Sequence, residues 1–241
     1  QFIALGFNIY TDVIGRDQII SQSRFLMERM TRELREALPN STRVQLSGDV
    51  QCIEFVPIQA SSSYVDIPVF PEPVSGIISV VEHGIDAVDA NKIVIYPLST
   101  FDVYGTDASA ALTGNIFAVA AAPSNGITAV NLALNNAVNF DSDSPTQRYY
   151  LVKNAISYCV NNVSGEAKRF SGYWPPATQV SPPSDWDNGV LMAENIRAGT
   201  TPFSYASATL IANAVVQLTL EFERNDETIS FNHEVHLVNV P

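Results

Sequence analysis

Pro39 divides the chain into two parts with different hydrophobic periods, and this change of period is the strongest constraint on the fold. In the stretch LMERMTRELREALPNSTRV (residues 26–44), Met27, Met30 and Leu34 recur at spacings of three and four with charged residues between them, as in an amphipathic helix. Proline ends such a helix because it has no N–H for the hydrogen-bond ladder and disfavours α geometry in the residue before it. After Pro39, apolar and polar residues alternate, which indicates strands.

The first part of the sequence predicts one long helix over residues 1–38. At 1.5 Å per residue this helix would be about 57 Å long, which exceeds the width of a domain on which it could pack. We therefore expect residues 16–38 to pack on the rest of the chain and residues 1–14 to project from it. The expected apolar stripe consists of Ile9, Val13, Ile20, Met27, Met30, Leu34 and Leu38. The apolar side chains expected to be free for a partner include Phe2, Leu5 and Ile9.

The second part, residues 39–241, is predicted to be an antiparallel β-rich domain. β-Branched and aromatic segments are separated by turn clusters such as ASSS at 60–63. A short helix is expected near 106–113, and the last two strands flank Asn225–Asp226 as a long hairpin. The predicted strands are 42–46, 50–58, 77–82, 92–97, 115–121, 127–131, 148–153, 155–161, 168–173, 210–223 and 228–239. The predicted fold class is α+β, with a long N-terminal helix packed on an antiparallel β-sheet domain.

Charge differs strongly between the two parts. The net charge is −12, yet residues 1–43 hold six of the 13 basic and five of the 25 acidic residues, so the remainder carries −13. An acidic domain lacks the basic face that phosphate binding requires, so no nucleic-acid partner is expected. The helix arginines could instead contact an acidic surface of a neighbouring protein, or they could decorate a solvated face in i,i+4 pairs such as Glu28 with Arg32. These arginines are Arg24, Arg29, Arg32 and Arg35.

Sequence patterns of catalysis and metal binding are not found. His233 and His236 fall on opposite faces of a predicted strand, so they cannot share a metal without a bulge. Asp141 and Asp143 resemble the first half of a calcium loop, but the glycine and the terminal glutamate of that loop are missing. No nucleophile elbow, zinc-protease helix or phosphate loop is present. We expect no catalytic residue, no metal and no cofactor.

The two cysteines, Cys52 and Cys159, each lie in a strand-like run. Buried free thiols of a cytosolic protein are one interpretation. A disulfide is favoured because lysine is scarce and the loops are rich in Asn, Ser, Thr, Gly and Pro, as in extracytoplasmic proteins. In the chain-entropy model a bridge across this separation stabilises the fold by nearly 5 kcal/mol at most.

The loop from Tyr173 to Gly189 contains Trp174, Trp186 and four prolines. The tryptophans either pack this loop onto its own sheet or form an exposed aromatic contact for a partner.

The helix pattern has no N-cap and continues to the first residue, where QFIALGFNIY is apolar enough to be the end of a membrane span. Together with the charged segment RDQIISQSRFLMERMTRELREALPNSTRV (16–44), it resembles the N-terminal helix of type IV pilins and type II secretion pseudopilins. The resemblance is closest to the MshO-type minor pilins of the mannose-sensitive haemagglutinin (MSHA) pilus. It is carried by ELREALPNSTRV and, later in the chain, by SPTQRYYLV leading into AISYCV, by LMAENI and by HEVHLVNVP.

This resemblance implies a pilin-like fold and a structural role in the assembly or initiation of a pilus, within its tip complex, in support of surface attachment. It implies partners among other minor and major pilins and an inner-membrane assembly platform, with a periplasmic domain that later becomes extracellular. It also implies that a leader and the apolar first half of the helix precede the present sequence. The alternatives are a GspJ-type minor pseudopilin of type II secretion and a carbohydrate-binding adhesin module.

Overall fold

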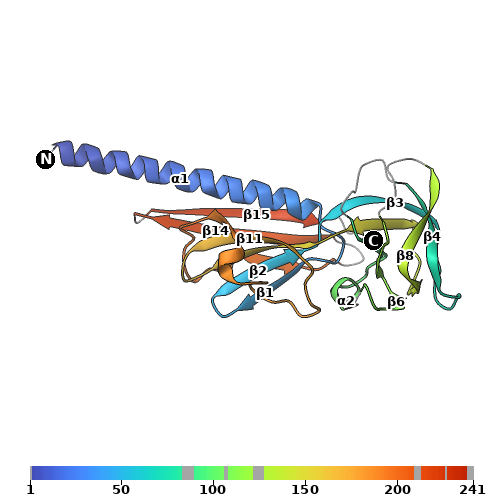
Figure 1. The fold of residues 1–241 in the computed structure, drawn as a ribbon. Helices are drawn as coiled ribbons and strands as arrows, with labels where there is room; N and C mark the ends of the chain where they lie inside the picture. The colour runs from blue at the N-terminus through green and yellow to red at the C-terminus, as the bar shows by residue number, and fades with distance from the viewer. Residues whose placement is uncertain are drawn as a thin grey trace.

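The computed structural model describes residues 2–82, 90–105, 108–121, 128–208, 213–225 and 227–237, and it describes the side chains of the first helix from Ile14 onward. Figure 1 shows an elongated molecule with two β lobes. Helix α1 (Phe2–Arg35) runs along one lobe, and the second lobe lies beyond its C-terminal end. The first part of α1 extends past the strands beneath it.

The strands of the described ranges form three sheets. The first sheet has the order β1-β2-β10-β11-β12, with β1 (Arg43–Ser47), β2 (Val50–Phe55), β10 (Ala155–Asn161), β11 (Glu166–Tyr173) and β12 (Val190–Ala193). The second has the order β13-β14-β15, with β13 (Phe203–Ala206), β14 (Ala214–Arg224) and β15 (Glu227–Leu237). The third has the order β6-β8-β4-β3-β9-β5-β7, with β3 (Ile58–Asp66), β4 (Ser75–Val81), β5 (Lys92–Ile95), β6 (Thr113–Gly114), β7 (Ile116–Ala118), β8 (Ala129–Phe140) and β9 (Arg148–Val152).

The predicted fold class is wrong. Instead of α+β with one antiparallel domain beneath a helix, the described chain is mostly β, its strands are divided among three sheets, and β6 pairs with β8 in parallel. The alternation of residues identifies strands one by one, but long-range pairings decide how many sheets they form. Phe55 of β2, for example, lies opposite Ile156 of β10.

Several local predictions also differ from the structure. The serine-rich segment expected to be a turn lies inside β3, where Ser61 and Ser62 pair with the tyrosines of β9, and β12 and β13 were not predicted. The expected helix at 106–113 begins outside the described residues and is a turn from Ala108 to Ala110. A short helix α2 (Thr100–Tyr104) forms earlier because Ser99 and Asp102 make a capping box. The predicted C-terminal hairpin is confirmed, since β14 and β15 pair over their full length.

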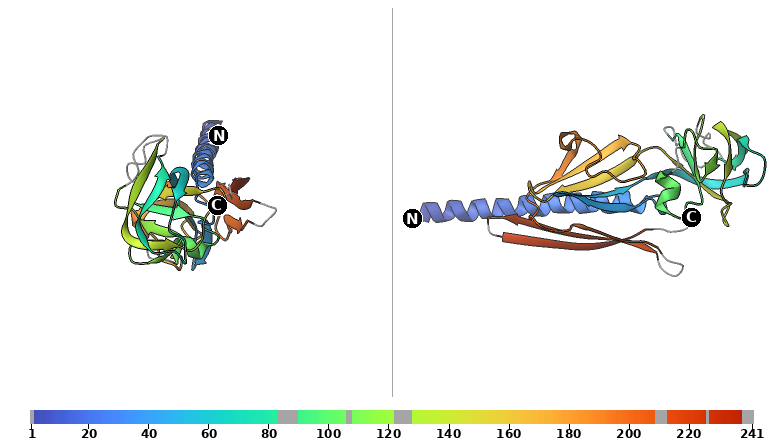
Figure 2. Two further views of the ribbon diagram at one scale, coloured as in Figure 1. Left: turned by 90° about the vertical axis from the view of Figure 1, so that its right-hand side faces the viewer. Right: turned by 90° about the horizontal axis from the view of Figure 1, so that it is seen from below.

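Helix α1 buries one face in a core shared by the first two sheets. Figure 2 shows strands of the first sheet on one side of α1 and the β14–β15 hairpin on the other. The buried face is spaced by three or four residues, as an amphipathic helix requires. It contains Ile19, Ser23, Leu26, Met30 and Leu34, and it packs with Ile53, Phe55, Tyr158, Leu218, Leu220 and Phe222. Ile20, predicted to be part of this face, is only half-buried because the face is centred on Ile19.

The second lobe has a core of its own and is joined to the first through a smaller cluster. Its sheet curls back on itself, because Val119 after β7 forms a bridge with Leu134 of β8. Its interior includes Phe117 and Phe140 in edge-to-face contact, with ring centroids 4.9 Å apart. The joining cluster includes Leu38, Val56, Tyr104, Tyr150, Val152 and Ala155. Leu38, in the segment that follows α1, therefore packs where the two lobes meet.

The predicted disulfide between Cys52 and Cys159 is confirmed. The two cysteines lie directly opposite each other on β2 and β10, with Cα atoms 4.1 Å apart. They face away from α1 and lie beneath the loop that follows β11, together with Phe170 and Trp186. The bridge therefore fastens the first strands after the helix to the middle of the same sheet.

We expect Leu34→Ala to lower the free energy of unfolding by about 3 kcal/mol, because Leu34 is fully buried and its removal leaves a cavity between helix and sheets. Phe25→Ala on the same helix is the matched control, since Phe25 is 52% exposed and should cost much less. Urea titrations of the two variants measure the difference. Equal losses would show that α1 is not seated on the sheets through Leu34.

Candidate functional site

The candidate functional site is the surface of α1, and a polar network first fixes this helix to the sheet below. The Glu33 carboxylate accepts hydrogen bonds from Tyr158 Oη at 2.8 Å and from Arg169 Nε at 3.0 Å. It also accepts one from Arg29 Nε at 3.1 Å, one helical turn away. Tyr158 and Arg169 lie on β10 and β11, so one carboxylate ties the helix to two strands of the first sheet.

The pKa of Glu33 reflects this network. Burial by itself raises the pKa of the carboxyl, but the hydrogen bonds from Arg169, Tyr158 and Arg29 outweigh burial and lower the pKa below its ordinary value of 4.5. The pKa of Tyr158 is raised by burial and by the negative charge of Glu33, so Tyr158 stays a donor. The network therefore holds an ionised carboxylate between two guanidinium groups.

A second set of contacts holds α1 near the tip of the β14–β15 hairpin. Arg224 Nη1 donates to Gln18 Oε1 at 2.6 Å, and Arg16 Nη1 lies 3.3 Å from Glu227 Oε1. Gly15 is buried here, and a Cβ at this position would lie 3.5 Å from Arg224 Nε. These contacts are solvent-exposed, so each contributes little to stability.

The outward face of α1 carries a stripe of exposed residues with alternating spacings of four and three. These residues are Ile14, Gln18, Ser21 and Phe25, and the same spacing continues through the exposed Glu28, Arg32 and Arg35, which border the groove beside β15. Ile14 is 40% exposed and Phe25 is 52% exposed, so the first half of the stripe presents apolar side chains to solvent. Alternating spacings of four and three are the pattern by which one helix packs along another. We refer to Ile14, Gln18, Ser21 and Phe25 as the outward stripe.

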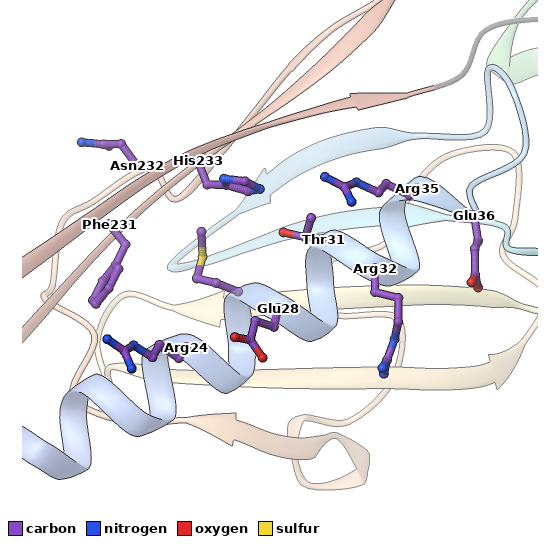
Figure 3. A pocket seen from close by; sticks show the side chains of 10 residues that line it. Arg24, Glu28, Thr31, Arg32, Arg35, Glu36, Phe231, Asn232 and His233 are labelled. Atoms are coloured by element: carbon purple, nitrogen blue, oxygen red, sulfur yellow. The ribbon is translucent and has the colours of Figure 1, made fainter.

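On the side of α1 that faces β15, a groove of about 640 Å³ separates the helix from the strand (Figure 3). Met27 of the helix and Phe231 of the strand provide its apolar lining. Arg24, Thr31 and Arg35 lie on the helix side that faces the strand in Figure 3, whereas Arg32 and Glu36 point away from it. His233 extends from β15 toward the helix.

The four arginines predicted as partner contacts fall into two groups. Arg29 is held by Glu33 and is not free for a partner. Arg24, Arg32 and Arg35 are exposed and have no hydrogen bond or ion pair with any residue in the described ranges; all three border the groove, but only Arg24 and Arg35 face β15. The predicted contacts Phe2, Leu5 and Ile9 lie on α1, and their side chains are outside the described residues.

The two tryptophans are half-buried and do not form a common surface. Lys92 Nζ lies 4.4 Å from the ring centroid of Trp174, and this ring also packs near Tyr104. Trp186 packs against Phe170 and donates its indole N–H to Glu166 Oε2 at 2.8 Å. Their loop covers the face of the first sheet that carries the disulfide.

Beneath the same loop lies a buried ionic cluster that the sequence did not identify as a site. Glu54 is fully buried and accepts hydrogen bonds from Arg43 Nε at 2.6 Å and from Tyr173 Oη at 2.7 Å. Arg43 also donates to the carbonyls of Pro176 and Ala177, which fixes the loop. The available signal was a glutamate at an inward position of an apolar strand. Because every group of the cluster has a partner and no described pocket opens onto it, we interpret the cluster as structural.

Among the described residues, no group of three or more His, Cys, Asp and Glu side chains could hold a metal ion, and Asp141 and Asp143 are both exposed. His83 lies outside the described residues. Over the described part of the chain, no helix is sufficiently long and apolar to cross a membrane.

Comparison with protein-family models, with curated proteins and with solved structures finds no match to this chain. No family is therefore shown, and function has to be argued from the geometry of α1 and from the sequence resemblance.

We predict that Glu33→Gln lowers the free energy of unfolding by about 2 kcal/mol at pH 7, because the amide cannot replace the ionised acceptor of three donors. The folded pKa lies below the unfolded pKa, so the contribution of Glu33 is complete above the unfolded value near 4.5 and is lost as pH falls through the folded value. Urea unfolding at pH 7 and pH 3 measures this change.

The matched control is Glu28→Gln, an exposed glutamate on the same helix. It should change stability by less than about 0.5 kcal/mol at either pH. A Glu33→Gln deficit as large at pH 3 as at pH 7 would contradict an electrostatic role for the network.

Proposed function

We propose that the protein is a structural subunit of a type IV pilus, in the class of the MshO-type minor pilins, and that it acts in pilus assembly or initiation rather than in catalysis. The observation that carries the proposal is the arrangement of α1. Its second half is built into the core of the first lobe, while its first half extends past the strands (Figure 1). A helix held in this way can pack on other helices while its β body remains outside them.

The outward stripe supports the same proposal. Exposed Ile14 and Phe25, separated by the small or polar Ser21 and Gln18, give α1 a face for a neighbouring helix. The expected partners are other minor and major pilins, contacted through this helix and through the β lobes. In the assembling cell the inner-membrane assembly platform is a further expected partner.

The attachment of α1 suits a subunit that bears load. Glu33 ties the helix to β10 and β11, and the Cys52–Cys159 bridge fastens β10 to β2. A pull on the helix would be distributed over several strands of the first sheet. A disulfide also fits an oxidising compartment, which supports the proposed periplasmic location before assembly and the extracellular location afterwards.

The alternative functions have less support. Carbohydrate binding through Trp174 and Trp186 would need exposed rings, but each ring packs against neighbours and lies near a lysine. A GspJ-type role in type II secretion uses the same features of α1, so it differs from pilus assembly only in the machine that the subunit serves.

We predict that Ile14→Asp together with Phe25→Asp, introduced into the full-length gene in its host, abolishes or strongly reduces surface pili because charge in the stripe opposes helix packing. Leu46→Asp is the matched control, since Leu46 on β1 is as exposed as Phe25, at 52%, but lies away from the helix. Electron microscopy counts pili, and immunoblots with melting curves confirm that each variant is present and folded.

Normal piliation in the stripe variant would contradict the proposed role of this helix face. Normal piliation in a strain without the gene, combined with loss of secreted enzymes, would instead assign the protein to a secretion system.

A further inference from the structure

The edge strands of the three sheets in the described chain differ in length. Five of the six edge strands are short: β1 has five residues, β12 and β13 have four each, β7 has three and β6 has two. The sixth, β15, has 11 residues, and within the described ranges it pairs only with β14. A long edge strand presents unpaired N–H and C=O groups that can accept another strand, and proteins usually shorten or cover such edges.

The opposite edge of the same sheet is closed. The side-chain amide of Gln51 donates from Nε2 to the Phe203 carbonyl at 3.0 Å and accepts from the Phe203 N–H at 3.1 Å. The Gln51 amide thus bonds to the backbone of Phe203 in the way that a peptide group of a strand next to β13 would. Among the described strands of this sheet, β15 is therefore the edge strand without a backbone partner on its outer side, and α1 lies in contact with it.

The sequence of β15 lacks the residues and irregularities that most often block strand pairing at an edge. ETISFNHEVHL contains no proline, lysine or glycine, and its register with β14 is uninterrupted from Glu227 to Leu237. Its two charged residues are Glu227, which is paired with Arg16, and Glu234, which lies on the exposed face away from the groove. The less exposed side chains of β15 alternate with exposed ones and include Ile229, Phe231, His233, Val235 and Leu237. Phe231 and His233 extend toward α1 (Figure 3). A strand added at this edge would direct alternate side chains into the groove between β15 and α1.

The charge of the groove selects the kind of strand. Of the arginines in the described ranges, only Arg24, Arg32 and Arg35 lack a hydrogen bond or ion pair, and all three belong to the lining of this groove together with Glu28 and Glu36. Arg24 and Arg35 lie on the side of the helix that faces β15, whereas Arg32 and Glu36 point away, so positive charge exceeds negative charge beside the strand. The groove also has an apolar floor at Met27 and Phe231. An incoming segment with carboxylates on either side of an apolar side chain would match both features.

The dimensions agree with this match. Arg24 and Arg35 are separated by about 16 Å along the helix axis at 1.5 Å per residue. Two residues four apart on a strand are separated by about 13 Å. The flexible arginine side chains can span the difference.

We propose that the edge of β15 binds an extended acidic segment of another protein as an added strand, with its carboxylates on Arg24 and Arg35 and an apolar side chain on Met27 and Phe231. This inference goes beyond the proposed function, because strand addition at β15 requires no contact with the outward stripe. A second copy paired through its own β15, with its helix on the same side, fits less well: beside the groove this face of β15 presents Phe231 and His233, and the one carboxylate on the face, Glu227, is already paired with Arg16 of its own helix at 3.3 Å.

The experiment measures fluorescence anisotropy of a labelled heptapeptide, Thr-Glu-Thr-Val-Thr-Glu-Thr, with the intact 241-residue chain. We expect saturable binding that weakens as salt concentration rises. Replacing both glutamates of the peptide by lysine should weaken binding at least about tenfold, and so should N-methylation of alternate peptide nitrogens, which removes backbone donors without changing charge.

Protein variants test the groove itself. The double variant R24Q/R35Q should bind the glutamate peptide about tenfold more weakly. R148Q is the control outside the groove because Arg148 is exposed and lies on β9 in the other lobe, and it should bind like the original chain. Melting curves show whether the variants are folded. The comparison of the glutamate, lysine and N-methylated peptides uses the unaltered chain, so it tests the proposal even if a variant does not fold.

Three results would overturn the proposal. One is the absence of binding at millimolar glutamate peptide. Another is equal binding of the N-methylated peptide, which would reduce the interaction to charge attraction. The third is sedimentation of the chain as a dimer that R24Q/R35Q dissociates, which would make a second copy the occupant.

Discussion

The buried face of α1 is the contact on which the first lobe depends. Leu26, Met30 and Leu34 pack at once against the first sheet and against the β14–β15 hairpin, so a single helix face covers apolar residues of two separate sheets. The two sheets are joined directly by a backbone bridge between Ile196 and Phe222, and the helix adds an apolar contact shared by both. Glu33 adds a directional contact to this apolar one, because its three donors fix the rotation of the helix over β10 and β11.

The first sheet is covered on both faces by different means. Helix α1 covers one face with apolar side chains, whereas the loop after β11 covers the other through Trp186, the disulfide and the Arg43–Glu54 pair. Because both faces of the first sheet are covered by the chain itself, a partner can reach the first lobe only at other surfaces, and we consider two of them. They are the outward stripe of α1 and the groove beside β15, and they serve the helix packing and the strand addition proposed above.

Some of this arrangement could be predicted from sequence and some could not. The end of the helix before Pro39, the C-terminal hairpin and the disulfide follow from local chemistry or from there being only two cysteines. The serines of β3 resemble a turn by composition, and only pairing with β9 makes them a strand. The role of Glu33 depends on Arg169, which is 136 residues away, and the groove depends on where β15 lies relative to α1. Such relations exist only after the sheets have formed.

Native-state hydrogen exchange of α1 tests the central claim most directly. If the helix is part of the core of both sheets, the amides from Leu26 to Leu34 should exchange only through global unfolding, with the same opening free energy as the central amides of β10 and β14. That free energy should fall in parallel for all three elements as denaturant is added. Opening of α1 at a free energy more than about 2 kcal/mol lower, independent of denaturant, would contradict the claim because the sheets would then persist without the helix.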